Sequence, residues 1–345
     1  MRTFSGSKGF GVDRFSGIYI WILFVVVFGA LSPDLFLNST TLRSVATEQA
    51  VVAMLGLALV APLACGVFDL SIGAHVTLSA VLVSMMQERY GFGMWEAIAI
   101  TLTCGILIGT INGFIVVYLK VSSFIGTLGV GTILAAVQTI ATNNLEPLPP
   151  TSRSWSLLTQ HTVLGFPMVV WYLLVLAVVL WWLLEVKPFG RYVYAVGGNA
   201  EAARLSGLRV DRYTWLSFIL CGAITSLAGV FYASLVGPSL TFGSSLLLPA
   251  FAAAFLGFTQ IRPGRFNVWG TVIAVYVLAT GVRGLQMLTS VQWLNDMFNG
   301  VALILAVAFA GWRQRARLTR KPPEAPPVAA DDAAGSRPDV GAHIH

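Results

Sequence analysis

Long apolar blocks separated by short polar segments run through most of the 345-residue chain. A helix that crosses a bilayer needs about 20 predominantly apolar residues, and ten blocks come close enough to this length to be interpreted as spans. Their expected bounds are 17–31, 45–66, 71–86, 94–119, 124–142, 163–184, 214–236, 246–258, 268–282 and 297–312. The pattern predicts an all-α membrane protein of about ten transmembrane helices, with the short eighth and ninth spans bent or partly re-entrant.

Composition supports this interpretation. Hydrophobic residues make up 56% of the chain and charged residues only 10%, whereas soluble domains carry about 25% charged residues. The mean hydropathy is +0.78. These values exclude a soluble enzyme, a nucleic-acid-binding protein and a disordered protein. Cys65, Cys104 and Cys221 lie in apolar blocks, so we expect small buried hydrophobic residues and no disulfides. The first block lacks a small-residue cleavage site, and we expect a retained helix.

The positions of the 21 Lys and Arg residues predict the orientation. With ten spans and the N-terminus in the cytoplasm, 17 basic residues lie inside and four, namely Arg43, Arg89, Arg153 and Arg283, lie outside. Basic residues concentrate on the cytoplasmic side of membrane proteins. Both termini are therefore expected in the cytoplasm.

The chain divides into three expected parts. Residues 1–16 form a cytoplasmic N-terminal segment, residues 17–312 form the transmembrane domain, and residues 313–345 form a disordered cytoplasmic tail rich in Pro, Ala and Asp. Within the domain, the outer connection at residues 143–162 is expected to be polar and irregular because it contains Pro147, Pro149 and Pro150.

A single carboxylate, Asp69, interrupts the apolar run of residues 50–86. A charge in this setting is costly unless it is capped, paired or hydrated. We expect a helix break at residues 66–68, after which Asp69 accepts the free amides that open the next helix. The functional interpretation is a discontinuous helix near a translocation path. The capping role and this functional role can hold together. The candidate residues there are Asp69, Ser71, Gly73 and His75.

Chemistry-bearing motifs are scarce. The chain has no GxxxxGK[ST] phosphate loop, no HExxH and no CxxC. Ser71 and His75 would share a helix face, but a capping serine near a polar histidine is the favoured interpretation over an intramembrane hydrolase. We therefore expect no catalytic residue, no metal site and no cofactor in this chain.

The polar stretch at residues 185–213 is far longer than a connection between spans requires. Two glycines are expected to break the chain, Asn199 to cap a short helix, and Gly207 to end it. Such a helix is either a docking element for a soluble partner or an interfacial helix held by basic residues at anionic lipid. The candidate coupling residues are Gly197, Gly198, Asn199, Glu201, Ala202, Ala203, Arg204, Leu205 and Gly207.

Three stretches resemble the ribose/xylose/arabinose permease family of bacterial ABC importers. They are DLSIG at residues 69–73, GTLG at residues 126–129 with Thr132 and Ile133 after it, and GRYVYAVGGNAEAARLSGLRVDRY at residues 190–213. The resemblance extends over about residues 46–310, and the third stretch is its most specific part.

This resemblance implies a multi-pass permease subunit in the bacterial cytoplasmic (inner) membrane, surrounded by membrane lipid. Such a subunit forms a homodimer or heterodimer of permeases, binds two copies of an ABC ATPase, and receives its solute from an extracytoplasmic sugar-binding protein. ATP and Mg²⁺ are expected on the partner ATPase, and no nucleic acid is involved. Residues 199–207 resemble the coupling helix that seats in the ATPase cleft.

The chain also departs from the family pattern. Phe258 and Phe266 stand where two glycines are common, and Pro263 stands in place of a third. Arg283 precedes Gly284 where an Asn-Gly pair is common. Since glycines allow close helix packing and sharp turns, we expect altered local geometry at these positions. The departures also argue against assigning to this chain the substrate of a well-known family member.

We therefore expect the permease subunit of an importer for a monosaccharide or related small polar solute, working by alternating access driven by a separate ATPase. One alternative is an ion-coupled secondary transporter, which needs intramembrane carboxylates or a proton relay. A membrane enzyme that uses Ser71 and His75 is another. Within the transport class, the solute is alternatively a polyol or a signalling sugar.

Overall fold

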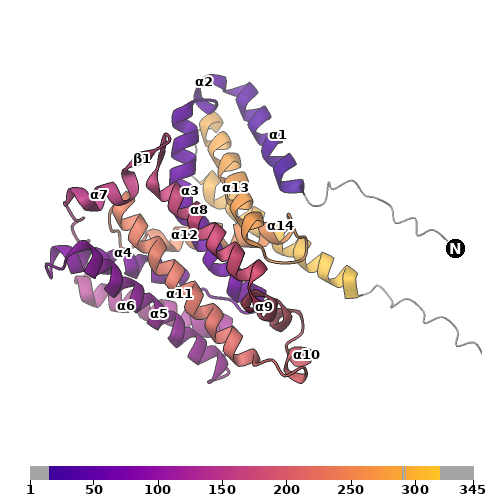
Figure 1. Ribbon diagram of the computed structural model, residues 1–345. Helices are drawn as coiled ribbons and strands as arrows, with labels where there is room; N and C mark the ends of the chain where they lie inside the picture. The colour runs from indigo at the N-terminus through magenta and orange to yellow at the C-terminus, as the bar shows by residue number, and fades with distance from the viewer. Residues whose placement is uncertain (1–14, 290, 292, 319–345) are drawn as a thin grey trace, which may run out of the picture.

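The computed structural model describes residues 15–318 except 290 and 292, and its regular structure is almost entirely helical. Figure 1 shows the helices packed side by side in one bundle. Their bounds are α1 (Ser16–Leu31), α2 (Pro33–Phe36), α3 (Ser39–Ala64), α4 (Ile72–Glu88), α5 (Met94–Val117), α6 (Ser123–Thr142), α7 (Arg153–Gln160), α8 (Met168–Trp181), the π-helix η2 (Trp182–Val186), α9 (Pro188–Gly198), α10 (Ala200–Leu205), α11 (Val210–Leu235), α12 (Phe242–Phe258), α13 (Val268–Thr289) and α14 (Leu294–Leu318).

Every predicted span overlaps a helix, although several bounds differ. The ninth is longer than predicted, because α13 continues to Thr289. The eighth, α12, is a 17-residue helix with Pro249 inside it. The sixth begins at Met168 instead of residue 163, because β1 (Thr162–Val163) and β2 (Phe166–Pro167) form a hairpin before it.

Among the described residues, six helices are long and apolar enough to cross a membrane, namely α3, α5, α6, α8 with η2, α11 and α13. Segments of α1, α12 and α14 are apolar but shorter. In contrast, α4 is in neither group. Buried His75, Thr77, Ser79 and Ser84 interrupt its apolar sequence, and a helix enclosed by other helices needs no continuous apolar surface. The protein is thus a multi-pass helical protein, and the count of ten spans stays a prediction.

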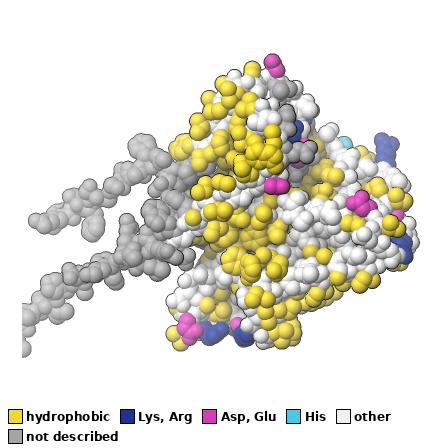
Figure 2. Space-filling view, turned by 180° about the vertical axis from the view of Figure 1, so that it is seen from behind, with side chains coloured by type: hydrophobic (Ala, Val, Ile, Leu, Met, Phe, Trp, Pro, Cys, Tyr) yellow, Lys and Arg dark blue, Asp and Glu magenta, His cyan; other side chains and the backbone are white. Residues whose placement is uncertain are grey.

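The core of the bundle lies around α3 and α11. All residues of α3 from Ala50 to Ala64 are buried, and α11 packs against α3, α4 and α5. On the outside, α6 exposes large apolar side chains, such as Ile125 at 67% and Ile140 at 77%. Figure 2 shows hydrophobic side chains spread over the flank and most charged side chains near its edges, as expected for a surface that faces lipid.

The connection at residues 143–162 differs from the prediction of an irregular loop. It contains the helix α7, whose Trp155 and Thr159 are buried. These residues are four apart and so share one helix face. Ser234 of α11 donates a hydrogen bond to the Trp155 carbonyl oxygen at 2.6 Å and is 2.8 Å from the Thr159 hydroxyl. The amphipathic spacing explains why a proline-rich connection still carries a docked helix.

The bundle has two ends that matter below. The α10 end carries α9, α10 and the connection between α12 and α13, and the α7 end carries α2, α7 and the β1–β2 hairpin (Figure 1). The last described helix, α14, extends to Leu318, past the boundary expected at residue 312. Residues 1–14 and 319–345, which hold most of the predicted terminal segments, lie outside the described residues.

Candidate functional site

The helix break expected near Asp69 is present. The chain leaves α3 at Ala64 and enters α4 at Ile72, and residues 65–71 between them are not helical. Gly66 has a φ of 83°, a conformation that side chains with a Cβ rarely adopt. The break therefore follows directly from the Cys65-Gly66 sequence at the end of α3.

The Asp69 carboxylate accepts a hydrogen bond from one backbone amide directly before α4, that of Ser71, instead of from the several helix-opening amides expected. Its Oδ1 accepts hydrogen bonds from the Ser71 backbone amide at 3.0 Å and from the Ser71 hydroxyl at 2.6 Å. Asn112 of α5 donates to both carboxylate oxygens at 3.3 and 3.4 Å and to the Ser71 hydroxyl at 2.8 Å. All three residues are at most 1% exposed, and this set of donors offsets the cost of burying the carboxylate.

Neighbouring helices hold the rest of the break. The Thr127 hydroxyl of α6 accepts a hydrogen bond from the Leu70 amide at 2.9 Å, and the Ser123 hydroxyl accepts one from the Phe68 amide at 3.1 Å. Asn112, Thr127 and Ser123 were not among the predicted site residues. An amide side chain inside the apolar sequence of α5 was the one indication available for Asn112, since polar side chains in such helices need a partner.

The other predicted residues of this region have separate contacts. His75 Nε2 is 3.0 Å from the Ser226 hydroxyl of α11, so histidine and Ser71 form no nucleophile–base pair. Gly73 faces the first turn of α12, where a Cβ on it would lie 2.9 Å from the Gly243 carbonyl oxygen. The two glycines thus allow α4 and α12 to approach closely.

The short helix expected at residues 199–207 is also present as α10. The Asn199 side chain accepts a hydrogen bond from the Ala202 amide at 3.0 Å, and Gly207, with a φ of 85°, follows the helix end. Ala203 is 5% exposed and packs in a cluster with Val193, Val196 and Val210, whereas Leu205 is 82% exposed. One side of α10 is therefore anchored, and the other is free to contact a partner.

The two glycines before α10 behave differently from the prediction. Both lie within α9, and the chain changes direction one residue later, at Asn199, which has a φ of −162°. A Cβ on Gly197 would lie 1.8 Å from the Ala64 carbonyl oxygen, but a Cβ on Gly198 would meet no atom within 4 Å. Gly197 thus brings α9 onto the end of α3, directly before the break at Asp69.

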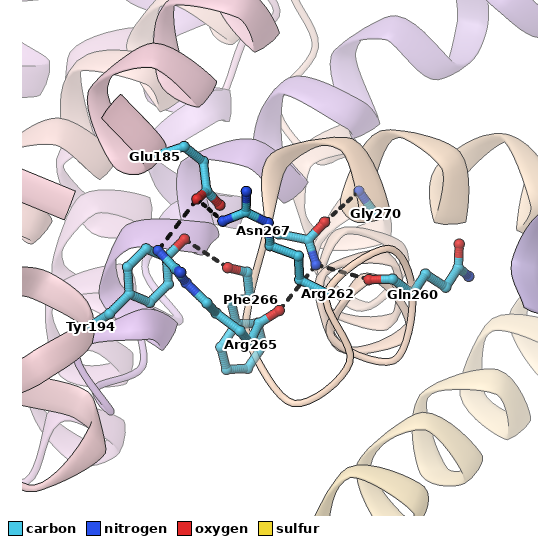
Figure 3. A network of polar contacts seen from close by, with 8 residues as sticks. All are labelled: Glu185, Tyr194, Gln260, Arg262, Arg265, Phe266, Asn267 and Gly270. Atoms are coloured by element: carbon cyan, nitrogen blue, oxygen red, sulfur yellow. Dashed lines mark hydrogen bonds and ion pairs between the residues drawn. The ribbon is translucent and has the colours of Figure 1, made fainter. Parts of the chain in front are cut away.

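A charged cluster ties α9 to the connection between α12 and α13 (Figure 3). The Glu185 carboxylate, with a side chain 6% exposed, pairs with Arg262 and lies 3.4 Å from Arg265. The Arg265 guanidinium lies 3.5 Å from the Tyr194 ring centroid. Burial raises the pKa of Tyr194 to about 12, so its hydroxyl stays protonated and donates to the Phe266 carbonyl oxygen at 2.8 Å.

Asn267 fixes the same connection from the other side. Its amide nitrogen donates to the carbonyl oxygens of Gly257, Gln260 and Arg265, each at 3.0 Å, and its amide oxygen accepts from Gly270 of α13 at 2.8 Å (Figure 3). Nothing in the sequence pattern marked this residue or the Glu185 cluster.

Three of the residues that depart from the family pattern, Phe258, Pro263 and Phe266, lie in this region. Phe258 and Phe266 contact each other, with ring centroids 4.8 Å apart, and Phe255 lies 5.4 Å from Phe266. Aromatic packing therefore occupies space here that glycines would leave for close backbone contact.

A surface groove lies next to α10 and the start of α11. Its volume is about 610 Å³, and its lining residues are Tyr118, Arg204, Leu208, Arg209, Val210, Asp211, Arg212 and Trp215. Asp211 pairs with Arg204 at 3.7 Å and with Lys120 at 3.5 Å. These side chains are more than half exposed, so the pairs order the surface more than they stabilise the fold.

Comparison with known proteins gives several related permeases. The autoinducer 2 import system permease protein LsrC of Salmonella typhi is 31% identical over 299 residues, covering 86% of this chain and 84% of that protein. The fructose import permease protein FrcC of Rhizobium meliloti is 30% identical over 311 residues, with coverage of 86% and 84%. The ribose import permease protein RbsC of Escherichia coli (strain K12) is 30% identical over 315 residues, with coverage of 89% and 97%.

No solved structure matches the chain. A family model described as "Branched-chain amino acid transport system / permease component" matches residues 41–307, a region that extends from α3 into α14. The match includes the break at Asp69, the α10 helix and the charged cluster at Glu185. The chain therefore belongs to the branched-chain amino acid transport system / permease component family.

Proposed function

We propose that the chain is the permease subunit of an ATP-binding-cassette importer for a monosaccharide or a related small polar solute. The observation that carries the proposal is the similarity, over most of the chain, to permeases named for import of autoinducer 2, fructose and ribose. In this role the chain moves solute by alternating access and performs no covalent chemistry itself.

The α10 helix is the proposed contact with the partner ATPase, which carries ATP and Mg²⁺. Three features support it: a capped helix, an anchored face at Ala203, and an outer face that presents Leu205 beside a charged groove. Movement of α10 would pass to α3 through Gly197 and to α12 and α13 through the Glu185 cluster. The Asp69 break, next to this contact, is proposed to border the translocation path.

The proposed orientation places the α10 end in the cytoplasm. Clusters of basic side chains support it, since cytoplasmic loops are enriched in Lys and Arg. The basic residues with described side chains at this end are Lys120, Lys187, Arg191, Arg204, Arg209, Arg212, Arg262 and Arg265. The proposal includes ten spans, a cytoplasmic (inner) membrane location, pairing with a second permease chain, and delivery of solute to the α7 end by a binding protein.

No observation favours the alternatives. Among the described residues, Asp69 is the carboxylate buried at the centre of the bundle, and hydrogen bonds from Ser71 and Asn112 occupy it. Few of its lone pairs are therefore available to bind or relay an ion. The His75 ring bonds to Ser226 instead of Ser71. The Ser71–His75 pair that the enzyme alternative requires is therefore not formed, since the Ser71 hydroxyl bonds to Asp69 and Asn112.

Photo-crosslinking tests the proposed docking face with a matched pair of positions. Leu205 in α10 is 82% exposed, and Leu164 in the β1–β2 turn at the α7 end is 83% exposed. A photoreactive amino acid replaces each in turn in the host cell, and mass spectrometry identifies the captured proteins. The proposal expects an ABC ATPase at Leu205 and none at Leu164. Capture of the ATPase at Leu164, or its absence at Leu205, would contradict it.

A further inference from the structure

A polar cavity lies between α3, α12, α13 and α14, towards the α7 end and away from the residues discussed above. Its volume is about 210 Å³. Apolar side chains such as Val52, Leu246 and Leu278 form part of its wall. The polar side chains of the wall are Glu48, Gln49, Arg283, Gln286, Asn295 and Asn299. Apolar walls with a few convergent polar groups are typical of small-molecule sites.

Arg283 is the residue that most strongly indicates a ligand. Its Nε atom is buried and has no hydrogen-bond partner in the described part of the chain. Glu48 lines the same cavity, yet no ion pair joins it to Arg283 among the described residues. A buried donor without an acceptor is destabilising, and more so when it is charged. An oxygen atom of a bound solute would supply the missing acceptor.

The amide groups of α14 are arranged to receive hydroxyl groups. The Asn299 side-chain nitrogen donates to the Asn295 side-chain oxygen at 2.9 Å. This bond leaves a donor on Asn295 and an acceptor on Asn299 without a partner among the described residues. Asn299 is 6% exposed, so its orientation is fixed by packing. A hydroxyl group, which both donates and accepts, complements such a pair.

Charge and size narrow the class of solute. One carboxylate and one guanidinium line the cavity, so its formal charge is zero, and a neutral solute needs no additional counter-charge. A volume of about 210 Å³ equals about seven water molecules at roughly 30 Å³ each. A pentose or hexose suits this space, and the apolar wall suits the C–H faces of its ring.

We infer that this cavity binds a neutral, polyhydroxylated solute of monosaccharide size, with Arg283, Gln286 and Asn299 as its hydrogen-bonding residues. The inference rests on the proposed function and adds the place at which the solute binds. The helices that line the cavity are also linked to the α10 end, because α9 contacts the end of α3 and the Glu185 cluster contacts the connection between α12 and α13.

Saturation-transfer NMR on the purified chain in detergent, without ATPase, measures this binding directly. The probes are ribose, fructose and, as a charged comparison, ribose 5-phosphate. Arg283→Ala removes the unpartnered donor, and Gln286→Ala tests the cavity while Arg283 is retained. Arg153→Ala is the matched control, because Arg153 is an exposed arginine of α7 that does not line the cavity.

We expect ribose or fructose to bind the unmodified chain and Arg153→Ala equally. Binding should weaken at least tenfold in Arg283→Ala and severalfold in Gln286→Ala, and ribose 5-phosphate should bind at least tenfold more weakly than ribose. Absence of binding by both neutral sugars, or equal binding to all variants, would overturn the inference. Failure of the proposed function gives a different result: the binding signal persists, but ATP drives no uptake.

Discussion

Gly197 is the position at which a single added methyl group should disconnect α9 from the transmembrane helices. In Gly197→Ala the new Cβ would lie 1.8 Å from the Ala64 carbonyl oxygen and 2.8 Å from the Ala64 carbonyl carbon. Neither is the flexible end of a side chain. Reaching an ordinary contact of 3.4 Å therefore requires a movement of about 1.6 Å between α9 and the end of α3.

This movement would open the small apolar cluster beneath α10. Val193, Val196 and Ala203 pack there against Ala64 and Cys65, and a gap of 0.5–1 Å already forfeits about a quarter to a half of a van der Waals contact. Overpacking of a well-packed site costs roughly 1–3 kcal/mol. If the displacement of α10 weakens ATPase binding by the same free energy, the association constant for the ATPase falls about 5- to 150-fold.

The matched control is Gly198→Ala, since a Cβ at residue 198 meets no atom within 4 Å. Both variants are purified in detergent, and their thermal unfolding midpoints and co-purification of the ATPase are compared. We expect Gly197→Ala to unfold at a lower temperature and retain less ATPase, and Gly198→Ala to behave as the unmodified chain. Equal behaviour of the two variants would refute the contact between α9 and α3.

Three further substitutions test the other contacts. Asp69→Ala leaves the Ser71 amide and hydroxyl without their acceptor and removes one of the two partners of Asn112, which should lower the unfolding free energy by roughly 3 kcal/mol; denaturation in detergent measures it, and an unchanged midpoint contradicts this role. Glu185→Gln removes the charge shared by two partly exposed arginines, so about 1–2 kcal/mol should be lost, with reduced coupling of ATP hydrolysis to uptake; full coupling would disprove the link. Asn199→Ala removes a helix cap of about 1 kcal/mol, and hydrogen exchange in α10 should accelerate about fivefold, whereas unchanged exchange would rule out the cap.

Local features of this fold could be predicted from the sequence. The apolar blocks marked the helices, Asn199 and Gly207 marked the ends of α10, and Asp69 after Gly66 marked the break. Each depends on residues within one or two helical turns, where spacing and capping preferences act directly. The lengths of α13 and α8 were less accurate, because apolar composition says little about where a helix stops.

Long-range contacts of the candidate site could not be predicted. Asn112 and Asp69 are 43 positions apart, and Arg262 and Glu185 are 77 apart. Their meeting depends on which helices pack together, and a helix inside a bundle carries no sequence pattern that names its neighbour. The same holds for the cavity at Arg283, which four separate helices enclose.

ATP-driven uptake into sealed vesicles tests the central claim most directly. The chain is reconstituted with its ATPase and binding protein, ATP is supplied on the side of the α10 end, and radiolabelled ribose and fructose are added on the other side. The account predicts accumulation of at least one sugar that requires ATP and is unaffected by collapse of proton and sodium gradients. Accumulation driven by an ion gradient in vesicles that lack the ATPase would contradict it.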